Sequence, residues 1–221
     1  MDLFDLIGPV MIGPSSSHTA GAARIGLTAF NLLGEPVAEA DIGLHGSFAK
    51  TYHGHGTDRA IAGGLMGMQV DDPRLRHSLE MAEEQGIHIV FHPITLRGAH
   101  PNTARLTLKG IHGAELTMVA ASIGGGNISI QELNDVHVDF SGKENTLIIQ
   151  HIDRPGLIAN VTGCLAQQHL NIATMQDFRK SIGASAMMVL ELDSIPTELT
   201  LMYLRVLDGV TGVTFLKRRV A

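Results

Sequence analysis

Four hydroxyls and one imidazole stand together near the N-terminus, in the run Ser15, Ser16, Ser17, His18, Thr19. An apolar pattern with helical spacing begins directly afterwards, at Ala20. Because serine and threonine side chains bond the free N–H groups of helix ends, this cluster is typical of a helix N-terminus. Such an end also attracts carboxylates and phosphates. Alternatively, the cluster only caps the helix, and the histidine lies in a loop without a function.

Three further polar segments flanked by glycine or proline interrupt the first half of the chain, at His53–Asp58, His100–Thr103 and Gly124–Asn127. Histidine titrates near neutrality and can donate or accept a proton or bind a metal. Each segment alone has a structural interpretation as a turn, a loop or a helix start. Four such segments in one small domain favour a site for a polar ligand. The glycine run lacks the Gly-Lys-Ser/Thr ending of a phosphate loop.

Composition limits the classes of protein that the chain can belong to. It has 221 residues, a net charge of −6 and one cysteine, Cys164. A single cysteine excludes an internal disulfide and an iron–sulfur centre held by this chain's own thiolates. No basic run exceeds 217–219, so no nucleic-acid partner is expected. With no apolar stretch of membrane length and no signal peptide, we expect a cytoplasmic protein without a membrane partner.

The elements of the first half must position these segments. Apolar spacing predicts a helix from Ala20 to Gly34, a strand over 40–48, and a helix that Thr57 caps and that runs to Met68. Asp72 and Pro73 mark another helix start, and Gly86 its end. Alternating or continuous apolar runs predict the remaining strands, which are 88–94, 104–109, 114–122, 128–130 and 136–140.

A polar, glycine-containing stretch at 141–145 suggests a domain boundary, giving domains 1–144 and 145–221. In the second domain, strands are expected at 146–152, 172–178, 184–192 and 213–216, with helices from Leu157 and over 197–206. This β-α-β-β-α-β order is the ferredoxin-like arrangement, so the predicted fold class is α+β. Cys164 lies in the first of these helices and is expected to be a small buried residue.

The polar motifs together resemble those of the bacterial iron–sulfur-dependent L-serine dehydratases. The shorter, β chain of the two-chain enzymes is similar to this sequence over essentially its whole length, including a C-terminal ACT domain. The resemblance implies a lyase that converts L-serine into pyruvate and ammonia. It also implies a [4Fe-4S] cluster ligated by the partner α subunit, with no metal ligand in this chain. The first domain would then resemble the allosteric substrate-binding domain of some phosphoglycerate dehydrogenases.

The resemblance also assigns residue roles. In this family an open iron acts as a Lewis acid on the substrate hydroxyl while a base removes the α-proton. His18 is the first candidate for proton transfer, and His55 with Asp58 the second. The expected substrate-binding residues are Ser15, Ser16, Ser17, Thr19, His100, Asn102, Thr103 and Gly125.

In the ACT-like domain, the expected amino-acid ligand contacts are Asp153, Gly156 and Leu157, and two ACT domains would pair in a homodimer. A module that only dimerises is equally compatible with this pattern.

Other classes make different demands on the sequence. A pyridoxal phosphate enzyme needs a Schiff-base lysine together with a phosphate-binding segment, and no such segment accompanies Lys50. A non-catalytic amino-acid sensor that regulates a partner enzyme is the main alternative. A self-contained histidine metal hydrolase is a third class, and it would retain stoichiometric metal.

Overall fold

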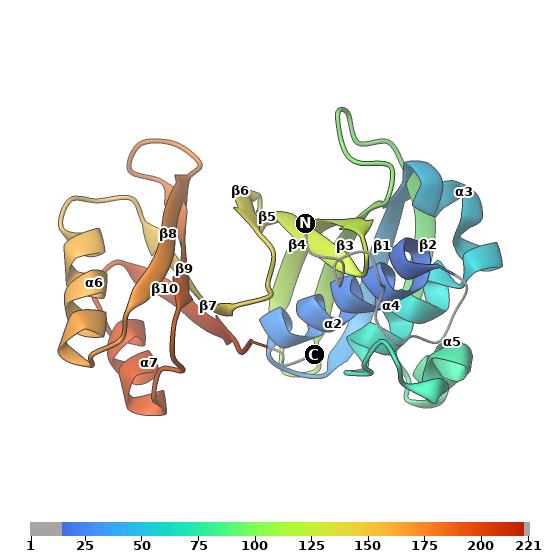
Figure 1. The fold of residues 1–221 in the computed structure, drawn as a ribbon, viewed down its shortest axis with the longest axis horizontal. Helices are drawn as coiled ribbons and strands as arrows, with labels where there is room; N and C mark the ends of the chain where they lie inside the picture. The colour runs from blue at the N-terminus through green and yellow to red at the C-terminus, as the bar shows by residue number, and fades with distance from the viewer. Residues whose placement is uncertain (1–14, 219–221) are drawn as a thin grey trace. The chain divides into compact units, whose positions relative to one another are not determined.

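The computed structural model describes residues 15–218. The chain divides into two compact units, Met1–Asn134 and Asp135–Ala221. Both combine helices with a β-sheet, which confirms the α+β class (Figure 1). The predicted domain boundary after residue 144 stays a prediction.

A π-helix and four α-helices provide most of the helical part of the described first unit. Ser15 precedes them in extended backbone, and its hydroxyl accepts from the backbone N–H of His18, so the predicted serine cap is present. The first α-helix ends at Gly34, whose φ is +78°. The bounds are η1 (Ser16–Gly21), α2 (Ala22–Leu33), α3 (Gly46–His55), α4 (Thr57–Leu65), the 3₁₀ helix η2 (Pro73–His77) and α5 (Ser78–Glu84).

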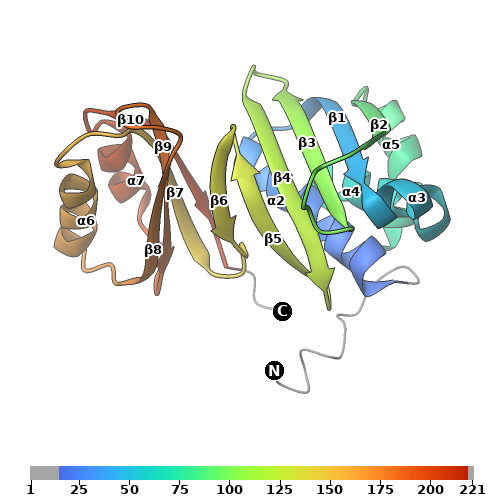
Figure 2. The same ribbon diagram turned by 90° about the horizontal axis from the view of Figure 1, so that it is seen from above.

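The strands of the first unit lie in the order β2-β1-β3-β4-β5 (Figure 2). Strands β1 and β2 are parallel, whereas the other neighbours are antiparallel. The parallel pair needs a crossover connection, which α3, α4, η2 and α5 supply. Helix α2 packs against β3, β4 and β5. The bounds are β1 (Val37–His45), β2 (His88–Ile94), β3 (Thr103–Gly110), β4 (Glu115–Gly124) and β5 (Asn127–Leu133).

Three predicted element ends around α3 and α4 are wrong. The strand expected over 40–48 ends at His45, because Gly46 takes a φ of +60° and begins α3. Helix α4 is preceded by Gly56, with a φ of +67°, and Thr57 is its first residue, not its cap. The helix also ends at Leu65, before the predicted Met68. At the end of β1 and at the start of α4, a glycine in the left-handed region sets the boundary.

Helices α2 and α4 approach so closely that only glycine fits between them. A Cβ on Gly26 would lie 2.3 Å from the carbonyl oxygen of Ile61, and one on Gly64 would lie 2.3 Å from the carbonyl oxygen of Ala23. These are backbone atoms, so the helices themselves would have to move apart. The close packing expected from the alanine- and glycine-rich face of α2 is therefore confirmed, with α4 as its partner.

We expect the substitution Gly64→Ala to lower the free energy of unfolding by about 1–3 kcal/mol, because overpacking forces backbone shifts. Urea denaturation followed by circular dichroism measures this. The matched control is Gly163→Ala in the second unit, where an added Cβ meets nothing within 4 Å. It is expected to be neutral or slightly stabilising. Equal losses in the two variants would contradict the packing argument.

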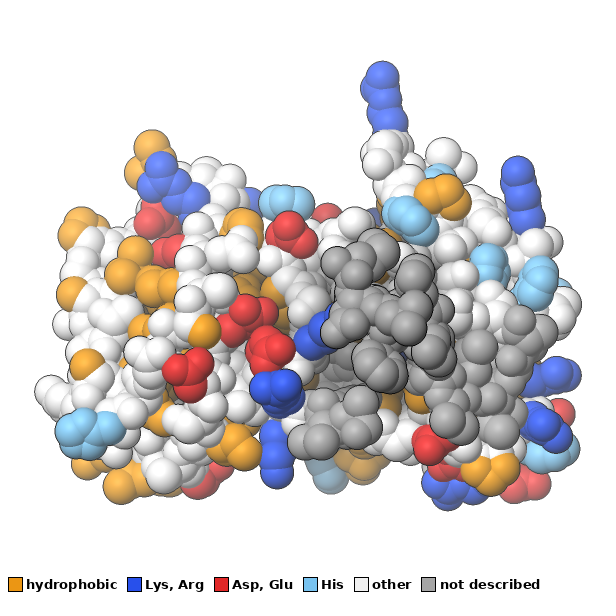
Figure 3. Space-filling model, in the orientation of Figure 1, with side chains coloured by type: hydrophobic (Ala, Val, Ile, Leu, Met, Phe, Trp, Pro, Cys, Tyr) orange, Lys and Arg blue, Asp and Glu red, His pale blue; other side chains and the backbone are white. Residues whose placement is uncertain are grey.

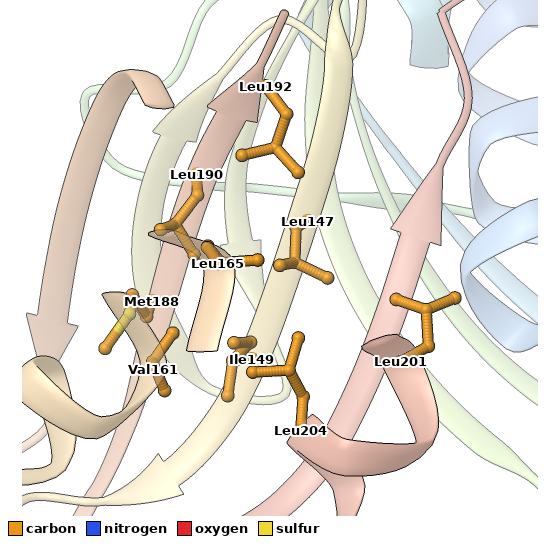
Figure 4. Packing of buried hydrophobic residues seen from close by; sticks show 9 residues of the cluster. All are labelled: Leu147, Ile149, Val161, Leu165, Met188, Leu190, Leu192, Leu201 and Leu204. Atoms are coloured by element: carbon orange, nitrogen blue, oxygen red, sulfur yellow. The ribbon is translucent and has the colours of Figure 1, made fainter. Parts of the chain in front are cut away.

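The second unit contains a β-α-β-β-α-β succession whose sheet has the order β10-β7-β9-β8. This is the ferredoxin-like arrangement that the sequence predicts. Leu147, Ile149, Met188 and Leu190 of the sheet pack against Val161, Leu165, Leu201 and Leu204 of the helices (Figure 4). The bounds are β6 (Val136–Phe140), β7 (Asn145–Ile152), α6 (Leu157–Gln167), β8 (Ile172–Arg179), β9 (Ser185–Leu192), α7 (Glu198–Arg205) and β10 (Val210–Leu216). Strand β6 contacts β8 and β9.

The surface carries charges of both signs. Over the described part of the face in Figure 3, lysine and arginine side chains are scattered among acidic ones. Within residues 15–218, no helix combines the length and the apolar character needed to cross a bilayer.

Candidate functional site

His18 lies at the centre of the polar residues of the first unit. The turn that carries it is a π-helix, a rare form often found at functional sites. Its Nδ1 lies 3.4 Å from Ser15 Oγ, and its Nε2 lies 3.0 Å from Ser47 Oγ. Hydroxyls can donate or accept, so either neutral tautomer of the imidazole is satisfied. The imidazole is therefore held between two hydroxyls.

The surroundings of His18 favour its neutral form. Its ring meets the Phe48 ring edge-on at 5.4 Å between centroids, and the tilted His55 ring at 5.1 Å. Partial burial lowers the pKa of His18 below its usual 6.5, and the positive charge of a protonated His55 lowers it further. An imidazole that is neutral at pH 7 can accept a proton, as a general base must.

Ser47 joins two of the predicted segments. Its backbone N–H donates to the carbonyl oxygen of Pro101 at 2.7 Å, while its hydroxyl contacts His18. Gly46 allows this approach, because a Cβ there would lie 2.6 Å from the Pro101 oxygen. Ser47 is not among the predicted site residues, because the apolar pattern places it inside a strand, whereas it lies in α3. A glycine before a serine at the end of a strand is the signal that could have identified it.

Two of the four hydroxyls in the run from Ser15 to Thr19 are engaged within the protein. Ser15 accepts from the His18 backbone, and the buried Thr19 hydroxyl donates to the carbonyl oxygen of His55 at 3.3 Å. Thr19 thereby fixes the π-helix against the end of α3. Ser16 and Ser17 are half-buried in the first turn of the π-helix.

Asp58 pairs with a different histidine from the one expected. Its Oδ2 lies 2.9 Å from His53 Nδ1, and its Oδ1 accepts from the backbone N–H of Arg59 at 2.8 Å. The Asp58 side chain is buried, whereas that of His53 is 76% exposed. His55 instead lies beside His18. The structure thus pairs Asp58 with His53 and places the His55 ring beside His18.

The loop from His100 to Thr103 is braced by its own side chains. The Asn102 N–H donates to His100 Nδ1 at 3.1 Å, and the buried Thr103 hydroxyl donates to the His100 carbonyl oxygen at 2.7 Å. The carbonyl oxygen of Asn102 accepts from the N–H of Ser122 at 2.9 Å. This loop is therefore tied to the end of β4 as well as to Ser47.

Three side-chain oxygens in this unit are buried without a hydrogen-bond partner among the described residues. They belong to Thr57, Asn102 and Ser122. A Cβ on Gly21 of the π-helix would lie 2.0 Å from Ser122 Oγ. Buried polar atoms are nearly always paired in native proteins, so each unpaired one needs an explanation such as a bound group. Of these, only Asn102 was predicted as a substrate contact. Thr57 was predicted as a helix cap within the polar segment His53–Asp58, and Ser122 stands alone in an apolar stretch that gives little signal.

The glycine run connects β4 with β5, and Gly125 takes a φ of +58° there. The guanidinium of Arg24 in α2 donates to the carbonyl oxygen of Gly126 at 2.9 Å. Gly125 thus lies in a turn that α2 contacts directly. Arg24 was not among the predicted site residues.

The predicted ligand contacts of the second unit have different environments. Asp153 Oδ2 accepts from the Gly183 N–H and from Arg179 Nη1, both at 3.1 Å. The Gly183 N–H first, and then Arg179, lower the pKa of Asp153. Gly156 is exposed with a φ of +88° at the start of α6, and Leu157 is buried in the core. Of the three, Gly156 offers backbone that a ligand could approach.

The residues of this chain do not fit an iron–sulfur cluster. Its single cysteine lies in α6 of the second unit and is half-buried. Burial raises the pKa of the Cys164 thiol, which disfavours the thiolate that a metal needs. Within residues 15–218, no group of three or more His, Cys, Asp or Glu side chains is arranged to hold a metal ion.

A surface hollow of about 460 Å³ lies beside α5 and β2. None of the residues described around His18 lines this hollow. Its lining residues are Leu79, Ala82, Glu83, Gly86, Ile87, His88 and Ile89. None of them is a predicted site residue.

Fold and site define a two-unit α+β protein in which one unit carries a histidine-centred polar site. Residues 1–85 match the family described as serine dehydratase beta chain. The probable L-serine dehydratase beta chain of Bacillus subtilis (strain 168) is 46% identical over 191 residues, 86% of each chain. The L-serine dehydratase beta chain of Peptoniphilus asaccharolyticus is 34% identical over 196 residues, 88% of each chain. The chain belongs to the serine dehydratase beta-chain family.

A second kind of protein is related to the chain over part of its own length. The D-3-phosphoglycerate dehydrogenase of Bacillus subtilis (strain 168) is 29% identical over 173 residues, which are 78% of this chain and 33% of that protein. The expected relation to a region of such dehydrogenases is therefore confirmed.

Proposed function

We propose that this chain is the β subunit of an L-serine dehydratase, a lyase that converts L-serine into pyruvate and ammonia. The beta-chain relatives support the family and the substrate. The observation that carries the proposal is the half-buried His18 between the hydroxyls of Ser15 and Ser47, with its pKa lowered. A neutral imidazole among hydroxyls is suited to moving a proton on a small polar substrate.

The partner in this proposal is an α subunit that ligates a [4Fe-4S] cluster. A chain called beta implies another chain, and this one has a single cysteine. The cluster would therefore be held entirely by partner thiolates. Such a complex is expected in the reducing environment of the cytoplasm, where free thiols persist.

The residues of this chain then bind L-serine and move a proton. His18 accepts the α-proton, and His55 affects the proton affinity of His18 through its charge. Asp58 stays a candidate for proton transfer through His53. Ser16 and Ser17, supported by Ser15 and Thr19, bind substrate oxygens from one side. His100, Asn102, Thr103 and Gly125 complete the substrate site from the two loops.

The second unit is proposed to be an ACT domain. Its ferredoxin-like order supports this, and the exposed Gly156 at the start of α6 would let an amino acid approach the backbone. Asp153 and Leu157 would shape that site. Two such units would pair in a homodimer.

We expect the purified chain alone to show no serine deamination, because the cluster lies in the partner. Anaerobic addition of the α subunit should restore pyruvate formation, measured with a coupled lactate dehydrogenase assay. The control is the α subunit alone, which should also be inactive. Activity of the isolated β chain that survives iron chelation would contradict the proposal.

A non-catalytic amino-acid sensor is the second candidate, favoured by the relation to part of a phosphoglycerate dehydrogenase. In that case the first unit would bind an amino acid and regulate a partner without taking part in chemistry. The effect of replacing His18 on turnover distinguishes the two candidates.

A further inference from the structure

Arg24 is a half-buried cation on α2 for which the described residues provide no carboxylate. Its Nη1 donates to the carbonyl oxygen of Gly126 at 2.9 Å. Five arginines that are more exposed than Arg24 pair with acids. These pairs are Arg74 with Asp72, Arg154 with Asp208, Arg179 with Asp153, Arg205 with Glu198 and Arg218 with Glu144.

The electrostatic environment of Arg24 agrees with this. Burial lowers the pKa of its guanidinium below its usual value. A lowered value means that the protein makes the charged form less favourable than water does. Arginine nevertheless stays protonated. A partly desolvated cation of this kind is stabilised when a ligand brings a negative charge.

The backbone that Arg24 contacts is a turn made of three glycines. Gly124, Gly125 and Gly126 have φ values of +95°, +58° and +73°, a conformation that only glycine adopts readily. A Cβ on Gly124 would meet nothing within 4 Å. The guanidinium therefore lies against a turn without side chains, with open space beside its first residue.

An unpaired hydroxyl marks the same region independently. Ser122 is fully buried, and its Oγ lacks a partner among the described residues. It stands two residues before the glycine turn and faces Gly21, which precedes Arg24 by three residues on the same helical segment. Positions three apart on a helix are neighbours on one face. The backbone N–H of Ser122 also donates to the carbonyl oxygen of Asn102 at 2.9 Å, which joins this region to a predicted substrate-binding residue.

We propose that Arg24, with the Ser122 hydroxyl and the Gly124–Gly126 turn, recognises the carboxylate of the substrate. The inference rests on the proposed function. Arginine presents a planar fork of donors that matches a carboxylate, and serine adds a third donor. A carboxylate held here would offset the charge of Arg24. Serine hydroxyls near His18 would then be available to the other end of the substrate.

The test compares Arg24→Gln with Arg24→Lys in the reconstituted αβ complex. We expect Arg24→Gln to raise KM for L-serine about 100-fold, because a charge-assisted pair is lost, while kcat changes less. Arg24→Lys should recover only part of the loss, since lysine lacks the fork. The control is Arg76→Gln, which removes an exposed arginine of η2 and should leave KM unchanged.

A binding measurement separates this inference from the proposed function. The isolated chain is titrated with L-serine and with L-serinamide, which lacks the carboxylate, and the Arg24 Nε–H signal is followed by NMR. If the wild-type complex turns over serine but Arg24→Gln keeps its KM, the carboxylate role is wrong and the proposed function stands. If the complex is inactive, the isolated chain still tests the inference. A shift of its Arg24 Nε–H signal with L-serine but not with L-serinamide supports carboxylate binding. Without that shift, the inference fails as well.

Discussion

Replacing His18 by alanine should reduce kcat for serine dehydration about 10³-fold in the αβ complex, since a positioned acid or base contributes ~10²- to 10⁴-fold. The reason is the position of the imidazole, which two hydroxyls hold at Nδ1 and Nε2 while His55 and Phe48 pack against it. Steady-state pyruvate formation measures the loss. KM should change much less than kcat, because His18 acts on the proton and the hydroxyls remain.

The pH profile supplies a second readout for His18. The pKa of its imidazole lies below the usual 6.5, so the neutral form predominates at pH 7. We therefore expect kcat/KM to be level from pH 7 upwards and to fall as the pH drops below 6.5 and the base becomes protonated. The acidic limb of the wild-type profile should be missing from the residual activity of His18→Ala.

The control is His112→Ala, which removes an exposed histidine whose backbone N–H bonds Glu35. Its activity and profile should match the wild type. If His18→Ala keeps wild-type turnover, the first unit is a binding module, and the sensor candidate replaces the enzyme. Circular dichroism and co-purification with the α subunit show whether the variant is still folded and assembled.

The second large effect is expected at Gly46, where alanine should lower the free energy of unfolding by about 3 kcal/mol. Left-handed backbone costs a non-glycine residue about 1–2 kcal/mol, and overpacking adds about 1–3 kcal/mol. The added Cβ would lie 2.6 Å from the carbonyl oxygen of Pro101. To relieve this contact, the backbone at Ser47 would have to move away from Pro101. The Ser47 hydroxyl contacts His18, so activity should fall together with stability.

Gly34→Ala is the matched control for Gly46→Ala. Gly34 has a φ of +78°, but an added Cβ there meets nothing within 4 Å. It should therefore show only the conformational cost, about 1 kcal/mol, and keep full activity. Urea denaturation and the pyruvate assay on both variants distinguish the cost of left-handed backbone from the cost of the contact with Pro101. Equal losses of stability would show that contact with Pro101 contributes nothing.

The second unit was well predicted because its signals are local. Strand β7 begins one residue before its prediction, and α7 differs from its prediction by one residue at each end. Alternating apolar residues and a threonine cap specify these elements within a few residues. The missed start of α3 differs in kind. Ile42, Leu44 and Phe48 continue an alternating pattern across Gly46, and the contact that turns the chain there comes from Pro101.

The candidate site was predictable only where polar residues are adjacent in the sequence. The run that contains His18 and the segment that contains His55 were identified, and the structure brings these two rings together. Ser47, Ser122 and Arg24 each stand alone among apolar or small residues. Their importance depends on partners across the fold, such as Gly126 for Arg24. Pairing of Asp58 with His53 depends likewise on how two helices meet.

The anchoring of the π-helix by distant segments also has a consequence for how the protein folds. His18 meets Ser47 across 29 positions of sequence, and Arg24 meets Gly126 across 102. Such non-local contacts form slowly and late, after the loops between them have closed. On a ribosome, the polar site stays incomplete until Gly126 has emerged. A fragment of residues 1–85, the part that matches the family, would carry His18 and Ser47 but neither Pro101 nor the glycine turn.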